Sequence, residues 1–75
     1  MTHRTILSIC DVENPSAKPL FDTDSYPVVP NVGEEIYVGS PNYLKTCKVV
    51  RREISYSTDT NGERTIFVLI WVNVL

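Results

Sequence analysis

The sequence predicts an all-β protein, a small antiparallel SH3-like barrel of four to five strands with a long C-terminal hairpin. Apolar residues nowhere recur at a helical period. The dipeptide Asn61-Gly62 stands between two long β-prone segments, and turn residues separate the other β-prone runs. Closure into a barrel is expected because it removes exposed strand edges. The 75 residues form a single domain, residues 1–75, and chains of this size often add stability by oligomerising.

The first half of the chain is expected to hold one strand and a long loop. Arg4 to Val12 is rich in β-branched and apolar residues, which favours a strand. Residues 13–31 contain four of the five prolines, and proline at this density excludes a helix and favours an extended loop. The aromatic loop residues Phe21 and Tyr26 either pack under the barrel or serve as anchors for a partner protein.

The second half is expected to hold a short strand followed by the long hairpin. The short strand covers Glu35 to Val38, and Pro41 marks the turn after it. The hairpin runs from Leu44 to Ser57 and from Arg64 to Leu75, joined by a two-residue type I′ turn at Asn61-Gly62. This turn sets a register that places one mixed aromatic and aliphatic set on the core face: Ile54, Tyr56, Phe67, Leu69 and Trp71.

The opposite face of the last strand then carries an aliphatic row: Ile66, Val68, Ile70, Val72 and Val74. Leaving such a row in water forgoes about 1.5–3 kcal/mol for each side chain that burial would have covered. Either the barrel curls or the N-terminal segment packs across the row, or the row is an interface. A bulge near Val50-Arg51-Arg52 would move the preceding residues to the other face, because the apolar parity changes there.

The segment Val28-Val-Pro-Asn-Val-Gly-Glu-Glu-Ile-Tyr-Val38, followed by a turn, Cys47-Lys-Val-Val50 and an aliphatic final strand, forms a recurrent pattern. It resembles small uncharacterised bacterial and bacteriophage proteins in which a proline-x-aliphatic-Gly-acidic turn opens an SH3-like barrel. The likeness covers about half of the chain and concerns turn chemistry. It implies the barrel fold and a bacterial or phage source, with a host protein as partner if the source is a phage, and it carries over no site residues.

The chain lacks the residue patterns of catalytic and metal sites, so we expect no enzyme, no cofactor and no metal. The single histidine, His3, lies near the N-terminus and offers no secure general base. Cys10 and Cys47 form no C-x-x-C motif and are expected to be free thiols, although a disulfide is the alternative. Two carboxylate pairs are interpreted as solvated charge: Asp22 with Asp24, and Glu34 with Glu35.

The basic residues of the chain gather before the hairpin turn, at Lys45, Lys48, Arg51 and Arg52. Together with nearby tyrosines they could bind a single-stranded nucleic acid. Alternatively they guard a strand edge against aggregation, with Arg52 stacked on Trp71 as a cation–π pair. The formal net charge of −2 argues against nonspecific nucleic-acid binding, for which a basic domain is expected.

These observations predict a non-enzymatic protein-binding domain, an interaction adaptor or inhibitor, that associates through the aliphatic face of its last strand. Lys45, Lys48 and Arg51 would steer the encounter electrostatically. The alternative is a nucleic-acid-binding small β-barrel that uses the strand from Lys45 to Arg52. A homodimer is expected, as is a cytoplasmic location without membrane insertion, since no apolar run is long enough for a span and no secretory signal is recognised.

Overall fold

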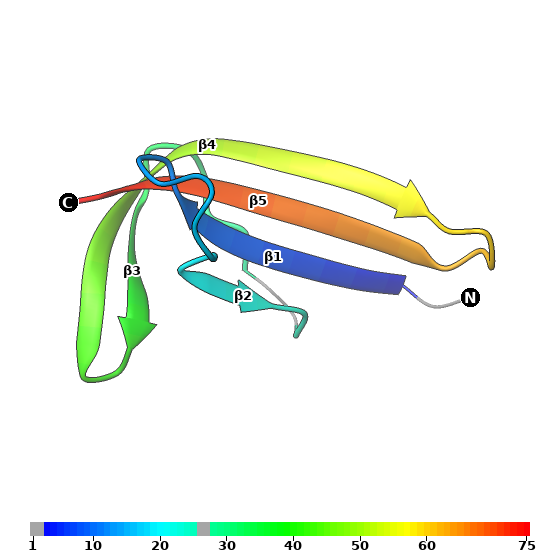
Figure 1. The fold of residues 1–75 in the computed structure, drawn as a ribbon, viewed down its shortest axis with the longest axis horizontal. Helices are drawn as coiled ribbons and strands as arrows, with labels where there is room; N and C mark the ends of the chain where they lie inside the picture. Colours follow the sequence, from blue (N-terminus) through cyan, green and yellow to red (C-terminus); the bar gives the residue numbers. More distant parts are fainter. Residues whose placement is uncertain (1–2, 26–27) are drawn as a thin grey trace.

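The computed structural model describes residues 3–25 and 28–75. This part of the chain holds five strands and no helix, which confirms the all-β class. The strands are β1 (His3–Asp11), β2 (Phe21–Thr23), β3 (Glu35–Ser40), β4 (Tyr43–Thr58) and β5 (Arg64–Val74) (Figure 1). The predicted strands and hairpin arms agree with β1, β3, β4 and β5 within two residues at each end. The predicted loop 13–31 is interrupted by the short strand β2.

The strands form one open sheet in the order β2-β1-β5-β4-β3. β1 runs parallel to β5, whereas the other three neighbouring pairs are antiparallel. The expected antiparallel SH3-like barrel is therefore replaced by a mixed sheet whose edges, β2 and β3, are not hydrogen-bonded to each other. The physical reason is that the N-terminal strand satisfies its backbone groups along β5, in register from His3 opposite Arg64 to Asp11 opposite Val72.

The hairpin turn differs from the predicted one by a single residue. The Asp59 backbone N–H donates to the Glu63 carbonyl (2.9 Å), and Gly62 N–H donates to the Asp59 carbonyl (3.1 Å). Gly62 has φ +81°, a conformation that glycine adopts without strain. The Asp59 carboxylate also accepts hydrogen bonds from the backbone N–H groups of Asn61 (2.8 Å) and Glu63 (3.0 Å). This side chain thus stabilises a three-residue loop in place of the type I′ turn.

The longer loop shifts the pairing of β4 with β5 by one residue. Tyr56 lies opposite Ile66, and Ile54 lies opposite Val68. A one-residue shift exchanges which residues of two strands share a face. The predicted pairs of Tyr56 with Phe67 and of Ile54 with Leu69 are therefore wrong.

The predicted bulge is confirmed. The register of β4 against β5 steps between Val49 and Arg51, so that Val50 is the extra residue. Because of this step, Val49 lies opposite Val72 and shares the face of the aliphatic row. A bulge also bends its strand, and in Figure 1 the first part of β4 turns away from the long ribbon together with β3.

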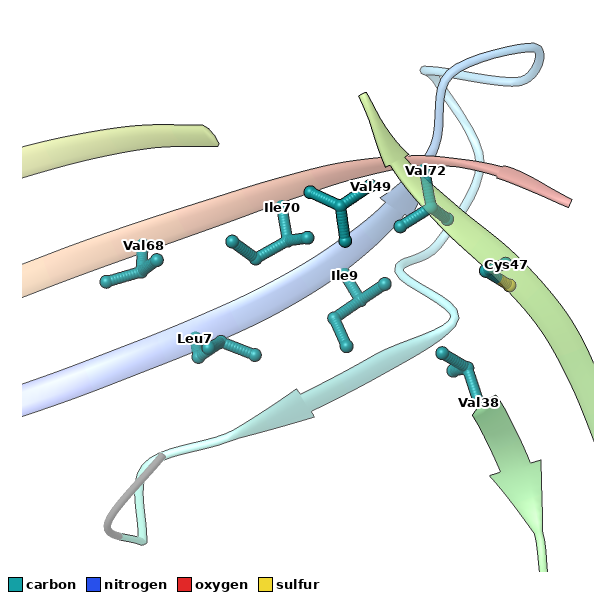
Figure 2. Close-up of a cluster of buried hydrophobic side chains, with 8 residues drawn as sticks. All are labelled: Leu7, Ile9, Val38, Cys47, Val49, Val68, Ile70 and Val72. Carbon is teal, nitrogen blue, oxygen red and sulfur yellow. The ribbon is translucent and has the colours of Figure 1, made fainter. Parts of the chain in front are cut away.

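The core lies in the angle produced by this bend. It consists of eight buried side chains: Leu7, Ile9, Val38, Cys47, Val49, Val68, Ile70 and Val72. Figure 2 shows that they come from β1, β3, β4 and β5 and gather between the ribbon and the bent β3–β4 segment. Each fully buried aliphatic side chain contributes about 1.5–3 kcal/mol relative to an exposed one.

The placement of the core corrects the expectation for the aliphatic row. Val68, Ile70 and Val72, predicted as interface residues, are buried inside the chain itself, and Ile66 is half-buried. Val74 alone of the row is exposed. The row is therefore covered within the chain, but neither by a closed barrel nor by the N-terminal segment, because the sheet is open and β1 lies beside β5. The register shift divides the residues predicted for the core face between the two sides of the ribbon. Ile54 and Tyr56 lie on the side of the aliphatic row and Phe67 on the other side, and all three are exposed.

The bent segment is itself a tight hairpin. Ser40 lies opposite Tyr43, which leaves Pro41-Asn42 as a two-residue connection. Gly39 precedes the turn with φ +143°, and a Cβ atom there would lie 2.3 Å from the Tyr43 carbonyl oxygen. Only glycine fits this close approach of the two strands. The hairpin therefore depends on Gly39 to bring β3 over the core.

Candidate protein-binding groove

A groove of about 360 Å³ opens between the edge strand β3 and the end of the sheet formed by β1 and β2. Ile9 and Val38, both core residues, line its apolar interior. Phe21 of β2 and Tyr37 of β3 also line it and are exposed to solvent. The segment 28–30 forms a further wall, and among the described lining residues only Glu34 is charged. The groove is an apolar, solvent-open feature of the kind that binds ligands or partner segments.

The loop that forms this wall is held in place by β4. Gly33 N–H donates to the Val49 carbonyl (2.8 Å), and Val49 N–H donates to the Glu34 carbonyl (2.9 Å). The Glu34 carboxylate accepts a hydrogen bond from Asn31 N–H (2.7 Å). The Asn31 side-chain oxygen in turn accepts one from Arg52 Nη1 (3.0 Å). The loop thus continues the sheet for one step beyond β3, and the groove wall is fixed by these contacts.

Apolar side chains remain exposed around the groove. Val28 keeps 89% of its surface exposed, and Phe21 and Tyr37 are exposed as well. Isolated exposed apolar residues are ordinary, but several around one apolar concavity indicate a contact surface. Of the two predicted loop anchors, the structure places Phe21 at this groove, whereas Tyr26 lies outside the described residues.

The groove borders an unused backbone edge. In an antiparallel pair, alternate residues direct their N–H and C=O groups to the same neighbour. The backbone N–H and C=O groups of Val49 point toward β3 and bond the loop there. Because this direction alternates along β4, the backbone groups of Cys47 also point toward β3, where Ile36 lies opposite. Glu35, Tyr37 and Gly39 then direct their backbone groups away from β4. Within residues 3–25 and 28–75, no strand pairs with this side of β3, which leaves it open to an added strand.

The four basic residues are not brought together on one face. Arg52 and Lys45 lie on the core side of the sheet. Arg52 pairs with Ile70 of β5, and Lys45 pairs with Val38 of β3. Lys48 and Arg51 lie on the outer side, opposite Asn73 and Trp71. A continuous basic strip along β4, which a bound nucleic-acid backbone would follow, is absent from this part of the described chain.

The predicted cation–π pair forms with a different arginine. The Arg51 guanidinium lies over the Trp71 ring, with Cζ 5.4 Å from the ring centroid. Arg51 also pairs with the Glu53 carboxylate, which accepts a hydrogen bond from Trp71 Nε1 (3.1 Å). The pairing shift between β4 and β5 explains the change, because it sets Arg51 rather than Arg52 opposite Trp71.

The two cysteines are free thiols, as expected. Cys10 lies opposite Trp71 on the outer side of the sheet, whereas Cys47 is fully buried in the core. Burial raises the pKa of both thiols; at Cys47, Lys45 opposes and Asp11 adds to this shift. The thiols stay protonated at neutral pH, which disfavours nucleophilic chemistry. Among the described residues, no cluster of His, Cys, Asp or Glu is arranged to hold a metal ion.

Comparisons with protein-family models, with curated proteins and with solved structures find no match to this chain. In residues 3–25 and 28–75, no helix has the length and apolar character needed to cross a membrane.

Most of the groove was not anticipated as a site. Val28, Val29 and Ile36 come from two segments that only the bend of β4 brings near Ile9. The available signal was local: an apolar Val28-Val29-Pro30 run inside an otherwise acidic region. A surface apolar run without a strand partner suggests a contact, but its location depends on the tertiary fold.

Proposed function

We propose that this chain is a non-enzymatic protein-binding module that takes an extended segment of a partner protein into the groove beside β3. The observation that carries the proposal is the meeting of an apolar concavity with an unpaired strand edge. Partners that bind by strand addition gain affinity from backbone hydrogen bonds and specificity from alternate side chains that enter pockets. The groove beside Glu35, Tyr37 and Gly39 offers both kinds of contact.

The lining of the groove defines the chemistry of the partner segment. An extended segment points alternate side chains to one face, so apolar residues at every second position would cover Ile9, Ile36 and Val38. Glu34, which is negatively charged, lines the groove and favours a lysine or arginine in the bound segment. The expected ligand is therefore an extended peptide of alternating apolar residues with a basic residue at one side.

Selection from a random peptide library displayed on phage tests this function. The immobilised full chain should enrich peptides with the alternating apolar and basic pattern, and synthetic versions should bind it in solution by isothermal titration calorimetry. Val28→Glu should abolish this binding, because it places a charge on an exposed apolar wall. Tyr37→Pro removes one outward N–H and should weaken binding about tenfold, the equivalent of one hydrogen bond.

The matched control is Tyr43→Ala, an exposed aromatic residue that does not line the groove, and it should bind like the wild type. Circular dichroism verifies that each variant retains the fold. Failure to enrich any peptide pattern, or binding that Val28→Glu leaves unchanged, contradicts the proposal. Salt-sensitive retention of a single-stranded oligothymidylate, lost on Lys48→Glu with Arg51→Glu, would favour the nucleic-acid alternative instead.

A further inference from the structure

A second unused strand edge lies at the other end of the molecule, in the distal part of β4. The β3 register ends with Glu35 opposite Lys48, and the loop from β3 bonds Val49. From Arg51 to Thr58, β4 pairs only with β5 among the described residues. The other side of this segment is an open edge, which we call the distal β4 edge. Its near end, Arg52, hydrogen-bonds Asn31 beside the groove wall. Residues 54–58 are not among the described residues that line the groove, so an inference about that outer part does not rest on the proposed function.

The hairpin turn shows which backbone groups are free on this edge. Asp59 N–H bonds the Glu63 carbonyl across the ribbon. By the alternation of an antiparallel ladder, the odd residues before Asp59 bond β5, and the even residues direct their N–H and C=O groups outward. The outward set is Arg52, Ile54, Tyr56 and Thr58. Long exposed edges are pairing sites unless charge, proline or a bulge blocks them.

The outer half of the edge carries none of these blocking features. The segment Ile54-Ser-Tyr-Ser-Thr58 has no charge and no proline, and the bulge lies earlier at Val50. Tyr56 keeps 78% of its surface exposed, and Ile54 is also exposed. Both lie on the core side of the sheet, opposite Ile66 and Val68. An uncharged edge flanked by two exposed apolar side chains is suited to edge-to-edge pairing.

We propose that two copies of this chain associate through their distal β4 edges, antiparallel, with Ser55 on the two-fold axis. A two-fold axis perpendicular to a sheet reverses the strand direction and keeps each face on its own side. Ile54 then lies opposite the partner's Tyr56, and Tyr56 lies opposite the partner's Ile54. Aromatic residues opposite β-branched ones are favourable cross-strand pairs. The two five-stranded sheets become one continuous sheet.

The charges of the edge select this register over its neighbours. With Ser55 on the axis, Arg51 lies opposite the partner's Asp59, and this pair of opposite charges occurs twice. An axis at Glu53 sets the two Glu53 carboxylates against each other, and an axis at Tyr56 opposes Glu53 to the partner's Asp59. Directly opposed like charges destabilise a strand pair. An axis at Ile54 removes both ion pairs, so Ser55 is the self-complementary centre.

Sedimentation equilibrium of the full chain tests the association. The wild type should sediment as a dimer. Tyr56→Lys should raise the dissociation constant at least tenfold, since it replaces the ring that meets the partner's Ile54 with an ammonium group diagonal to the partner's Arg52. Tyr56 is largely exposed in the single chain, so at a protein concentration at which both proteins are monomeric the variant should unfold in urea at nearly the wild-type midpoint. Tyr43→Lys, an exposed tyrosine away from this edge, is the matched control and should remain dimeric.

Disulfide trapping tests the register independently, in a Cys10→Ser background that removes the more accessible native thiol. Ser55→Cys places two thiols at a non-hydrogen-bonded pair, where Cα atoms are about 4.5 Å apart and a disulfide can form. Oxidised glutathione should convert this variant to a covalent dimer. Ser57→Cys, the control, should not crosslink because its two copies lie four residues apart along the strands. A monomeric wild type, or equal crosslinking at both positions, would overturn the proposal.

Discussion

The two parts of the β4–β5 ribbon carry similar apolar residues and bury them very differently. Near the bulge, Val49 faces Val72, and both are buried. Toward the turn, Ile54 faces Val68; Val68 is buried, but Ile54 remains 42% exposed. Val49 and Ile54 differ in exposure because the bent β3–β4 segment lies over the part of the ribbon near the bulge and does not reach Ile54. Alternating apolar residues thus define which face of a strand is apolar, whereas the bend of β4 decides which part of that face is buried.

Deletion of Val50 should erase this difference and have the largest effect. Without the extra residue, Val49 directly precedes Arg51 and stays on the core side opposite Val72, but β4 loses the bulge that bends it. The β3–β4 segment then no longer lies over the ribbon, and the core loses this cover. We expect loss of the cooperative unfolding transition, monitored by circular dichroism in urea. The control Val50→Ala keeps the bulge and should cost about 1 kcal/mol or less, as is usual for substitutions outside the core. A deletion variant that unfolds at the wild-type urea concentration would show that the bulge does not place the core.

Truncation of one side chain in each part should sharpen the comparison. Ile70→Ala removes a side chain with 0% exposure, so it should cost about 2–5 kcal/mol. Ile54→Ala should cost about 1 kcal/mol or less, because the side chain is already partly in water. Urea unfolding of both variants, at a protein concentration at which the chains are monomeric, measures the two values. Equal losses would mean that the distal part is covered in solution.

The smallest expected effect is a pH dependence in the covered part. Burial raises the pKa of Cys47 in the folded chain, whereas an unfolded thiol ionises at about pH 8.5. Above that pH the unfolded state loses protons first, so the free energy of unfolding falls as the pH rises; below it, the thiol has no effect. Urea unfolding at pH 7.5 and pH 10 should show a steeper loss for the wild type than for Cys47→Ala. Identical slopes would contradict this assignment.

Sequence reasoning located the strands well and their faces poorly. The arms of the hairpin and the bulge were predictable, because β-propensity, Asn61-Gly62 and the change of apolar parity are local signals. The face assignment failed at one residue: the Asp59 carboxylate caps a three-residue loop, and the resulting shift moved Ile54 and Tyr56 to the other side. The hydrogen bonds of one side chain therefore decided which residues of β4 share a face with the aliphatic row of β5.

The site depended even more on distant contacts. Phe21 was singled out as an anchor, but nothing near it in the chain indicated that Ile36 and Tyr37 would line the same groove. The interface predicted on Val68, Ile70 and Val72 instead became the core, because β1 and the bent segment satisfied that face. Burial within one chain and burial between chains produce the same apolar pattern in a sequence.

By itself, the sequence determined the all-β class, the long hairpin and the bulge, since these follow from propensity and turn chemistry over a few residues. Only the tertiary structure decided that β1 pairs in parallel with β5, that the sheet stays open, and that its edges β3 and distal β4 remain unpaired. The physical reason is that strand pairing joins backbone groups, which are alike in every residue. Which edges meet is therefore determined by the bend of the whole chain.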